Sequence, residues 1–232
     1  MPNSKRLALV TGAAGGIGAA VARSLCERGW RVVGLDRVAA SLEHPAFVLE
    51  TVDLAAATDV AAAAARWRDA DALVHAAGTL TVGALGALDH AAGEQMWRVH
   101  VQSVMLLADA LVPAMAVRGF GRVVLLGSRV AQGMPGRSQY AACKAALVAL
   151  ARSWAAEVVE RGVTVNVVSP AATRTAMLTD RGRAAAAPRV PPIGRYIEPA
   201  EVAAVVAFLL SDEAAVITGQ ELTICGGASL PR

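Results

Sequence analysis

A glycine-rich turn between an apolar run and a helix-forming run constrains this chain more than any other stretch. The apolar run is Leu7–Val10, and the turn covers residues 11–18. In a strand–turn–helix unit, glycines let the backbone approach a pyrophosphate, whose charge then sits at the helix N-terminus. The turn holds Gly12, Gly16 and Gly18 in the spacing Gly-x3-Gly-x-Gly. It predicts a dinucleotide site, although steric demands alone also produce glycine-rich turns.

The next expected strand ends in an acid that bears on the choice of dinucleotide. Asp36 closes the run from Arg31 and lies 20 residues after Gly16. At that distance a carboxylate can accept hydrogen bonds from the adenosine ribose hydroxyls, and it would repel a ribose 2′-phosphate. Position 15 is glycine and supplies no cation, which favours NAD over NADP. Arg37 instead favours NADP, because an arginine there could contact the 2′-phosphate. Asp36 could also simply be a turn residue at the end of a strand.

Short apolar runs alternate with helix-forming stretches through the rest of the chain. The runs at residues 46–49, 71–74 and 122–128 read as further strands. This alternation predicts an α/β fold: a Rossmann-type, doubly wound parallel sheet of about seven strands with helices on both faces. The length of 232 residues and an apolar share of 55% suit a single domain spanning residues 1–232. Such sheets bind ligands at the carboxyl ends of their strands.

Three local features refine this topology. Pro45 predicts a loop without a full helix between the second and third strands, and Asp53, with Leu54, ends the third strand where adenine could lie. The stretch Gly93–Arg118 reads as one long helix, apolar on more than one face and bent near Pro113. Such a helix needs the sheet on one side and a second covering surface, such as another subunit, on the other.

Tyr140 and Lys144 form the strongest candidate for chemistry. Strong helix formers surround them, so residues four apart lie on one face of a helix. A phenol titrates near pH 10, and an ammonium beside it lowers that pKa, which makes the pair a plausible proton-transfer catalyst. The chain has only two tyrosines and two lysines, so chance placement is rare. An ordinary helix surface remained an equal alternative on this pair alone.

Composition narrows the remaining classes. The formal charge of +3 comes from scattered arginines, which gives little support for nucleic-acid binding. Cys26, Cys143 and Cys225 lie far apart and form no metal spacing, so no metal is expected and a reducing, cytoplasmic location fits. No run of about 20 apolar residues predicts a membrane span, and no secretory segment is recognisable.

Taken in order, the motifs resemble the short-chain dehydrogenase/reductase family over about residues 6 to 228. The matching segments are Thr11-Gly12-x3-Gly16-Ile17-Gly18, Ala76-Ala77-Gly78, Ser128, Tyr140-x3-Lys144, Val165-Asn166-Val167-Val168-Ser169-Pro170, Pro192-Ile193-Gly194-Arg195 and Ile217-Thr218-Gly219-Gln220. Each segment is weak alone, but seven in order make the resemblance specific.

The resemblance implies roles for the matching positions. Tyr140 would be the general acid/base, Ser128 would bind the substrate oxygen, and Lys144 would bind the nicotinamide ribose while lowering the Tyr140 pKa. Thr175 would contact the nicotinamide carboxamide. The remaining cofactor contacts implied are Gly12, Gly16, Ile17, Gly18, Asp36, Asp53, Leu54, Ala77 and Gly78.

Four positions depart from the family pattern. His100 stands where an asparagine usually organises a water relay to the lysine, and it could carry protons or simply fill space. His75 replaces the usual asparagine before the Ala-Gly, and a lone histidine at a strand end is more often structural. Ala171 and Cys225 replace the usual glycine and aspartate. No core catalytic group is lost.

The family's substrate loop would fall at about residues 171–195. It contains Arg174, Arg181, Arg183 and Arg189, which suit a carboxylate or phosphate, although a solvated loop is the better supported interpretation. The resulting expectation is an NAD-dependent oxidoreductase for a small secondary alcohol or ketone, assembled as a homo-oligomer, either a homotetramer or a dimer. Alternatives are an NADPH-dependent 3-oxoacyl (acyl-carrier) reductase and, in another class, a non-catalytic cofactor-binding sensor or scaffold.

Overall fold

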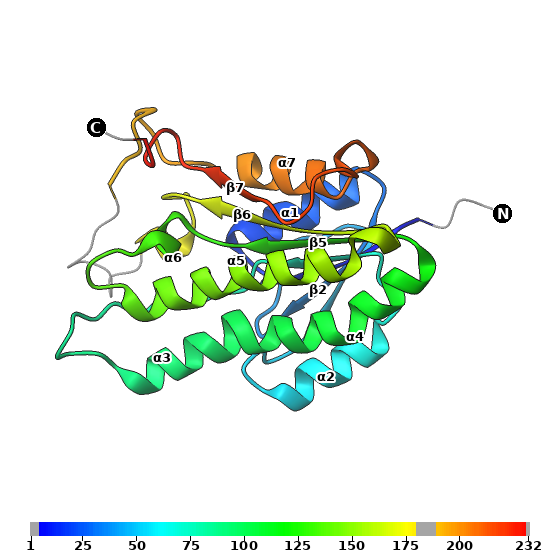
Figure 1. Cartoon of the computed structure of the whole chain (residues 1–232), viewed down its shortest axis with the longest axis horizontal. Coiled ribbons are helices and arrows are strands. Elements are labelled where there is room, and N and C mark those ends of the chain that lie inside the picture. Colours follow the sequence, from blue (N-terminus) through cyan, green and yellow to red (C-terminus); the bar gives the residue numbers. More distant parts are fainter. Residues whose placement is uncertain (1–4, 180–188, 231–232) are drawn as a thin grey trace.

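A seven-stranded parallel sheet forms the frame of the protein, in a computed structural model that describes residues 5–179 and 189–230 (Figure 1). The strand order is β3-β2-β1-β4-β5-β6-β7, and every neighbouring pair is parallel. The strands are β1 (Leu7–Thr11), β2 (Arg31–Asp36), β3 (Phe47–Thr51), β4 (Ala72–His75), β5 (Gly121–Leu126), β6 (Val163–Pro170) and β7 (Glu221–Ile224). The predicted doubly wound α/β fold is confirmed.

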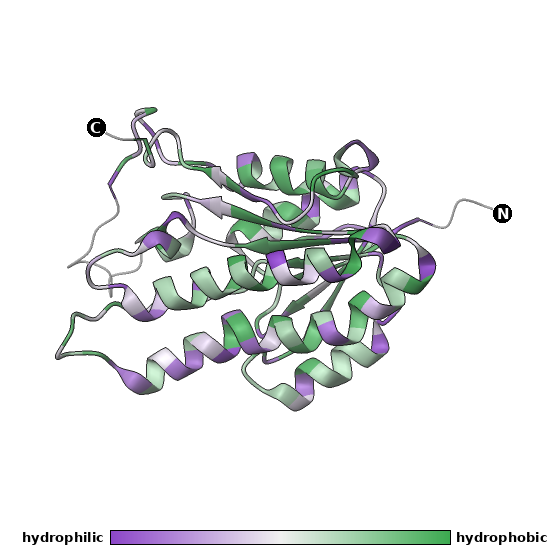
Figure 2. Cartoon of the chain, in the orientation of Figure 1, coloured by the Kyte–Doolittle hydropathy of each residue, from purple (hydrophilic) through white to green (hydrophobic). Residues whose placement is uncertain are grey.

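Helices cover both faces of this sheet. In Figure 1, α1 and α7 lie on one face, while α2, α4 and α5 lie on the other. The helices are α1 (Gly16–Glu27), α2 (Ala57–Arg66), α3 (His90–Trp97), α4 (Ser103–Arg118), α5 (Ser138–Val158), α6 (Ala176–Thr179) and α7 (Pro199–Leu209). Figure 2 shows apolar residues on the strands between these layers, so each face of the sheet has its own core.

The strand order reverses between β1 and β4. From β1 the chain builds β2 and β3 outward on one side, then crosses to β4 and builds β5, β6 and β7 on the other. At such a switch point the two connections leave in opposite directions, which opens a crevice above the carboxyl ends of the strands. The connection of residues 37–46 between β2 and β3 contains no helix, as Pro45 predicted.

The long helix differs in detail from the expected Gly93–Arg118. It begins at His90, and a π-helical turn at Arg98–Gln102 separates α3 from α4. Pro113 lies inside α4. By length and composition His90–Arg118 could cross a bilayer, but 61% of its most apolar window is buried in protein, as expected for a core helix.

The amino end of the sheet is tied together by cations and aromatic rings. The Phe120 ring lies between two guanidiniums, with the Arg6 Cζ 4.2 Å and the Arg122 Cζ 4.4 Å from its centroid. Arg6 also lies 5.9 Å from the Trp30 ring centroid and donates to Asp212 at 2.9 Å. This cluster, called here the basal clamp, joins the start of β1 to the start of β5 and to the turn after α7.

Candidate active site

One cavity of about 1340 Å³ opens at the carboxyl ends of the strands and gathers nearly all the predicted site residues. Pockets for one small ligand measure about 300–1000 Å³, so this one has room for a dinucleotide and a second molecule. The predicted residues that line it are Gly12, Gly16, Ile17, Asp36, Asp53, Leu54, Ala77, Gly78, His100, Ser128, Tyr140, Lys144 and Thr175. Of the predicted site residues, only Gly18 does not line the cavity.

The glycine turn between β1 and α1 needs its glycines for contact as well as conformation. Gly12 and Gly16 have φ values of 69° and 55°, in the left-handed region that favours glycine. A Cβ on Gly18 would lie 2.1 Å from the Gly12 carbonyl oxygen, and one on Gly12 would lie 2.7 Å from the Ala77 Cα. A Cβ on Gly15, by contrast, would meet nothing within 4 Å. The turn therefore packs backbone on backbone against α1 and the end of β4.

A buried hydroxyl fixes the switch point. Thr11 Oγ1 accepts hydrogen bonds from the Ala76 and Ala77 N–H groups at 3.1 Å and lies 2.9 Å from His75 Nδ1. With two N–H groups already donated to it, the hydroxyl donates to Nδ1, so His75 Nε2–H donates to the His100 carbonyl at 3.1 Å. Burial lowers the His75 pKa to about 3. His75 is thus a neutral structural link from β4 to the π-helical turn.

Asp36 ends β2 with its carboxylate beside the glycine turn. Its Oδ2 accepts from the Ala14 N–H at 3.0 Å and its Oδ1 from the Val38 N–H at 3.3 Å. These bonds orient the carboxylate, and each oxygen keeps a lone pair for a further donor. The neighbouring Arg37 is exposed and also lines the cavity. Asp36, which favours NAD, and Arg37, which favours NADP, therefore lie at the same end of the cavity.

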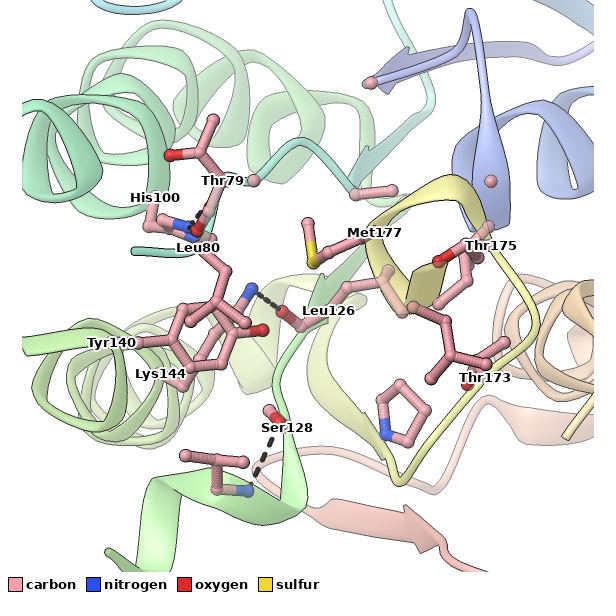
Figure 3. Close-up of a pocket in the computed structure, with 18 of the residues that line it drawn as sticks. Thr79, Leu80, His100, Leu126, Ser128, Tyr140, Lys144, Thr173, Thr175 and Met177 are labelled. Carbon is pink, nitrogen blue, oxygen red and sulfur yellow. Dashed lines mark hydrogen bonds between the residues drawn. The ribbon is translucent and has the colours of Figure 1, made fainter. Parts of the chain in front are cut away.

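Lys144, Tyr140 and Ser128 meet at the other end, as Figure 3 shows. Lys144 is buried, and its Nζ donates to the Leu126 carbonyl at 2.6 Å and lies 5.7 Å from the Tyr140 ring centroid. Burial lowers the Lys144 pKa to about 7. The Ser128 Oγ accepts from the Val130 N–H at 3.2 Å, which leaves its proton available for another acceptor. A helix and the end of β5 thus bring three polar groups to one place.

His100 packs behind Tyr140 in the π-helical turn. The two rings meet edge to face with centroids 5.5 Å apart. His100 Nε2 lies 2.8 Å from the Thr79 carbonyl oxygen and 3.0 Å from the Thr79 amide nitrogen, so whether it donates or accepts depends on the tautomer. Burial lowers the His100 pKa well below its ordinary value, so the ring is neutral. A Cβ on Gly78 would lie 2.3 Å from the His100 Cε1, which explains the glycine at that position.

Thr175 connects the two ends of the cavity. It follows β6 and immediately precedes α6, and its Cγ2 would lie 3.2 Å from a Cβ on Gly16. The side chain predicted to contact a nicotinamide carboxamide is therefore next to the glycine turn. Figure 3 shows it across the cavity from Tyr140 and Lys144, with Met177 between the two groups.

The arginines expected at the substrate end only partly match the structure. Arg174 turns outward and donates to Glu198 at 2.7 Å, whereas Arg189 does line the cavity. Arg181 and Arg183 lie outside the described residues. Sequence reasoning missed Arg129 and Arg137, which also line the cavity. The signal was their position, directly after Ser128 and three residues before Tyr140.

Comparison with known proteins gives a consistent picture. The family profile described as enoyl-(acyl carrier protein) reductase matches residues 12–229. The chain is 37% identical over 240 residues to the 3-oxoacyl-[acyl-carrier-protein] reductase FabG of Escherichia coli K12, covering 96% of each chain. It is 38% identical over 242 residues to the cis-4-hydroxycyclohexanecarboxylate dehydrogenase of Sinomonas cyclohexanicum, covering 97% of this chain and 96% of that one.

Solved structures agree with these relatives. A structure described as a short chain dehydrogenase/reductase family protein superposes with a TM-score of 0.90 at 36% identity, covering 98% of both chains. A putative betaketoacyl-ACP reductase superposes with a TM-score of 0.86 at 35% identity, covering 96% of this chain and 97% of that one. These matches agree with the parallel sheet, the glycine turn and the grouping of Ser128, Tyr140 and Lys144. The chain therefore belongs to the short-chain dehydrogenase/reductase family of oxidoreductases.

Proposed function

We propose that this protein is an NAD(H)-dependent oxidoreductase that interconverts a small secondary alcohol and its ketone, with Tyr140 as the general acid/base. The observation that carries the proposal is the meeting of Ser128, Tyr140 and Lys144 in the same cavity as the glycine turn. A non-catalytic sensor or scaffold would need the cofactor end of this cavity but not these three groups. Their retention therefore favours an enzyme.

The proposed chemistry is a coupled hydride and proton transfer. A bound nicotinamide supplies or accepts the hydride at the substrate carbon. During alcohol oxidation the Tyr140 oxygen takes the hydroxyl proton, and during ketone reduction it returns that proton to the oxygen. The Ser128 hydroxyl donates a hydrogen bond to the same substrate oxygen, which holds it near Tyr140 and stabilises developing negative charge there.

Lys144 would assist proton transfer by Tyr140 as a buried positive charge beside its ring. Burial lowers its pKa to about 7, so the ammonium is only partly populated near neutral pH. Ribose hydroxyls that accept hydrogen bonds from Nζ would favour the charged form. The charge would then favour the phenolate of Tyr140. His100, neutral and packed against Tyr140, remains a candidate for passing protons behind this pair or for filling space there.

The choice of NAD rests on Asp36. Its carboxylate is held at the cofactor end by the Ala14 N–H and would repel a ribose 2′-phosphate. Arg37 is the counter-argument, since its guanidinium lines the same end and could bind that phosphate. The turn of residues 12–18 contains no basic residue, so it offers the 2′-phosphate no second cation. We therefore expect NAD to bind at least about tenfold more tightly than NADP, or about 1.4 kcal/mol.

A 3-oxoacyl thioester reductase is the second candidate, and the relatives support this alternative better than the NAD-linked alcohol dehydrogenase. The Escherichia coli, Vibrio cholerae and Haemophilus influenzae relatives are all named 3-oxoacyl-[acyl-carrier-protein] reductases. The Sinomonas relative supports the first candidate, because its name describes a dehydrogenase of a cyclic secondary alcohol. Both candidates use the same acid/base and differ in cofactor and substrate.

A two-way activity screen tests both candidates. Purified protein would be assayed with NADH and NADPH against 3-oxobutanoyl thioesters, 4-oxocyclohexanecarboxylate and simple cyclic ketones, following cofactor absorbance. We expect turnover with NADH on at least one small ketone. Turnover only with NADPH on the thioester would replace the first candidate by the second. Cofactor binding with no turnover of any compound would support a sensor instead.

We also propose a cytoplasmic homotetramer built on α4 and α5. Large apolar side chains on the outside of these helices and their neighbours are exposed in the single chain, with Met105 45% and Val117 89% exposed. Closed symmetric pairing would cover such faces. Light scattering at micromolar concentration should give four times the 23.7 kDa chain mass, and a monomer would contradict the assembly.

A further inference from the structure

The acidic residues that line the cavity lie at one of its ends. The acidic ones among the described residues, Asp36 and Asp53, both lie at the cofactor end. Lys144 lines the cavity beside Tyr140, and Arg129 and Arg137, which lie close in sequence to Ser128 and Tyr140, also line it. The carboxylates are therefore confined to the cofactor end, which they share with Arg37, while the side chains around Ser128 and Tyr140 add only cations. A field of one sign in a cleft raises the local concentration of ligands of the opposite sign.

Two of these arginines come from the same segments as the reacting groups. Arg129 opens the 3-10 turn that directly follows Ser128, and Arg137 is the residue before α5, three positions ahead of Tyr140. This turn packs against α5. The Arg137 backbone also bridges to Gly83, which fixes its position at the cavity wall. Both residues thus line the cavity from segments that also carry the groups proposed to bind the substrate oxygen.

The surroundings of these arginines differ from those of arginines on the outer surface. Arg174 and Arg195 are exposed and are each bonded to a glutamate at 2.7 Å. Within residues 5–179 and 189–230, no hydrogen bond or ion pair engages the Arg129 guanidinium, although its side chain is half-buried. Arg137 is only 7% exposed. For Arg129, an anion placed beside the guanidinium would offset the cost of withdrawing it from water.

We propose that Arg129 and Arg137 bind the carboxylate of the substrate, so that the preferred substrate is a small alcohol or ketone carrying a carboxylate away from its reacting carbon. This inference rests on the proposed function of the same cavity. A planar guanidinium matches a carboxylate with two parallel hydrogen bonds. The first turn of α5 has no acidic residue and no side-chain cap, so the positive end of its dipole has the same sign.

A carboxylate fits this arrangement better than an acyl thioester. The acyl end of a thioester is neutral near its reacting carbonyl, and the phosphate of a carrier arm lies many bonds away. Arg137 lines the cavity and lies three residues before Tyr140. An anion that reaches it must be close to the reacting group, as in a hydroxy or oxo acid.

The kinetic test compares an acid with its own neutral ester. Reduction of 4-oxocyclohexanecarboxylate, its methyl ester and the N-acetylcysteamine thioester of 3-oxobutanoate would be measured with NADH and NADPH. We expect the acid to exceed the methyl ester in kcat/KM by at least about tenfold, mainly through KM, because a charged partner raises the strength of each hydrogen bond. Equal kcat/KM for acid and ester, or a preference for the thioester over both, would overturn the inference.

Four variants locate the effect. Arg129→Gln and Arg137→Gln should each lower kcat/KM for the acid about tenfold or more and leave the ester within about twofold, while Arg137→Lys should retain part of the acid activity. Arg66→Gln removes the same charge from the far surface, where Arg66 pairs with Glu50, and should behave as wild type. Equal losses on acid and ester would point to a structural role. If Arg137→Gln does not fold, Arg129→Gln still decides the matter.

A binding test separates this inference from the proposed function. Calorimetry would titrate cyclohexanecarboxylate and cyclohexanecarboxamide into the protein with saturating NAD, in wild type and Arg129→Gln. Tighter binding of the carboxylate, lost in the variant, supports the inference even if no ketone is turned over. Equal or absent binding of both compounds refutes it, even if neutral ketones are reduced and the proposed function stands.

Discussion

The two ends of the cavity are built in different ways. The cofactor end is made by backbone. The Gly18 backbone packs closely against the Gly12 carbonyl, and the Thr11 hydroxyl accepts hydrogen bonds from the two N–H groups that follow β4. The substrate end is made by side chains from separate segments, including Ser128, Tyr140 and Arg129. Where backbone forms a site, glycines mark it in the sequence. Where side chains form it, the fold must first bring them together.

The largest expected effect separates the two ends completely. Tyr140→Phe removes one oxygen from the substrate end and should lower kcat by about 10² to 10⁴, the usual contribution of a general acid/base. The affinity for NAD, measured by fluorescence titration, should stay within about twofold, since the glycine turn is unchanged. A variant with wild-type turnover would show that another group transfers the proton.

A glycine pair tests the cofactor end in the opposite way. Gly18→Ala would place a Cβ 2.1 Å from the Gly12 oxygen, so α1 must move and unfolding by urea should show a loss of about 3 kcal/mol. Gly15→Ala meets no protein atom within 4 Å and should cost no more than about 1 kcal/mol as an N-cap change. Equal losses in both variants would mean that backbone contact does not set this turn.

Lys144 gives the substrate end a stability that depends on pH. Burial lowers its pKa in the folded protein to about 7, below the ordinary 10.5. Between these values the unfolded chain binds the extra proton, so stability is lost as pH falls and gained as pH rises. From pH 7 to 9.5 wild type should gain about 3 kcal/mol relative to Lys144→Met in urea unfolding, at about 1.4 kcal/mol per pH unit.

Saturating NAD provides the control for that slope. Hydroxyl acceptors beside Nζ favour the charged form, so the difference between wild type and Lys144→Met should shrink when cofactor is bound. A pH profile identical in the two proteins without cofactor would show that the buried amine keeps its ordinary pKa.

The smallest effect concerns cofactor choice. Asp36→Ala should narrow the preference for NAD over NADP by about tenfold, since one carboxylate that repels a phosphate is removed. Arg37→Ala should change that ratio little if Asp36 governs it. Calorimetric titration of both cofactors measures the ratio in each variant. A large rise in NAD preference on removing Arg37 would instead mean that this exposed arginine already recruits the phosphate.

The sequence predicted the parts of this molecule that repeat or that need a special backbone. The alternation of apolar runs predicted the parallel sheet, and Pro45 predicted the missing helix between β2 and β3. The π-helical turn at Arg98–Gln102 was not predicted, because one extra residue in a helical turn leaves the apolar pattern almost unchanged. Arg129 and Arg137 were not predicted as lining residues either, because their place in the cavity wall depends on the packing of a turn against α5.

The basal clamp has an evolutionary consequence. Phe120 stacks with Arg6 and Arg122. It links β1, β5 and the turn at Asp212 at the amino end of the sheet, opposite the cavity. Stability generated there does not depend on which side chains line the substrate end. A lineage can therefore exchange residues such as Arg129 and acquire a new substrate while the folded frame persists. Relatives of about 37% identity with differently named substrates are what such a division of labour would leave behind.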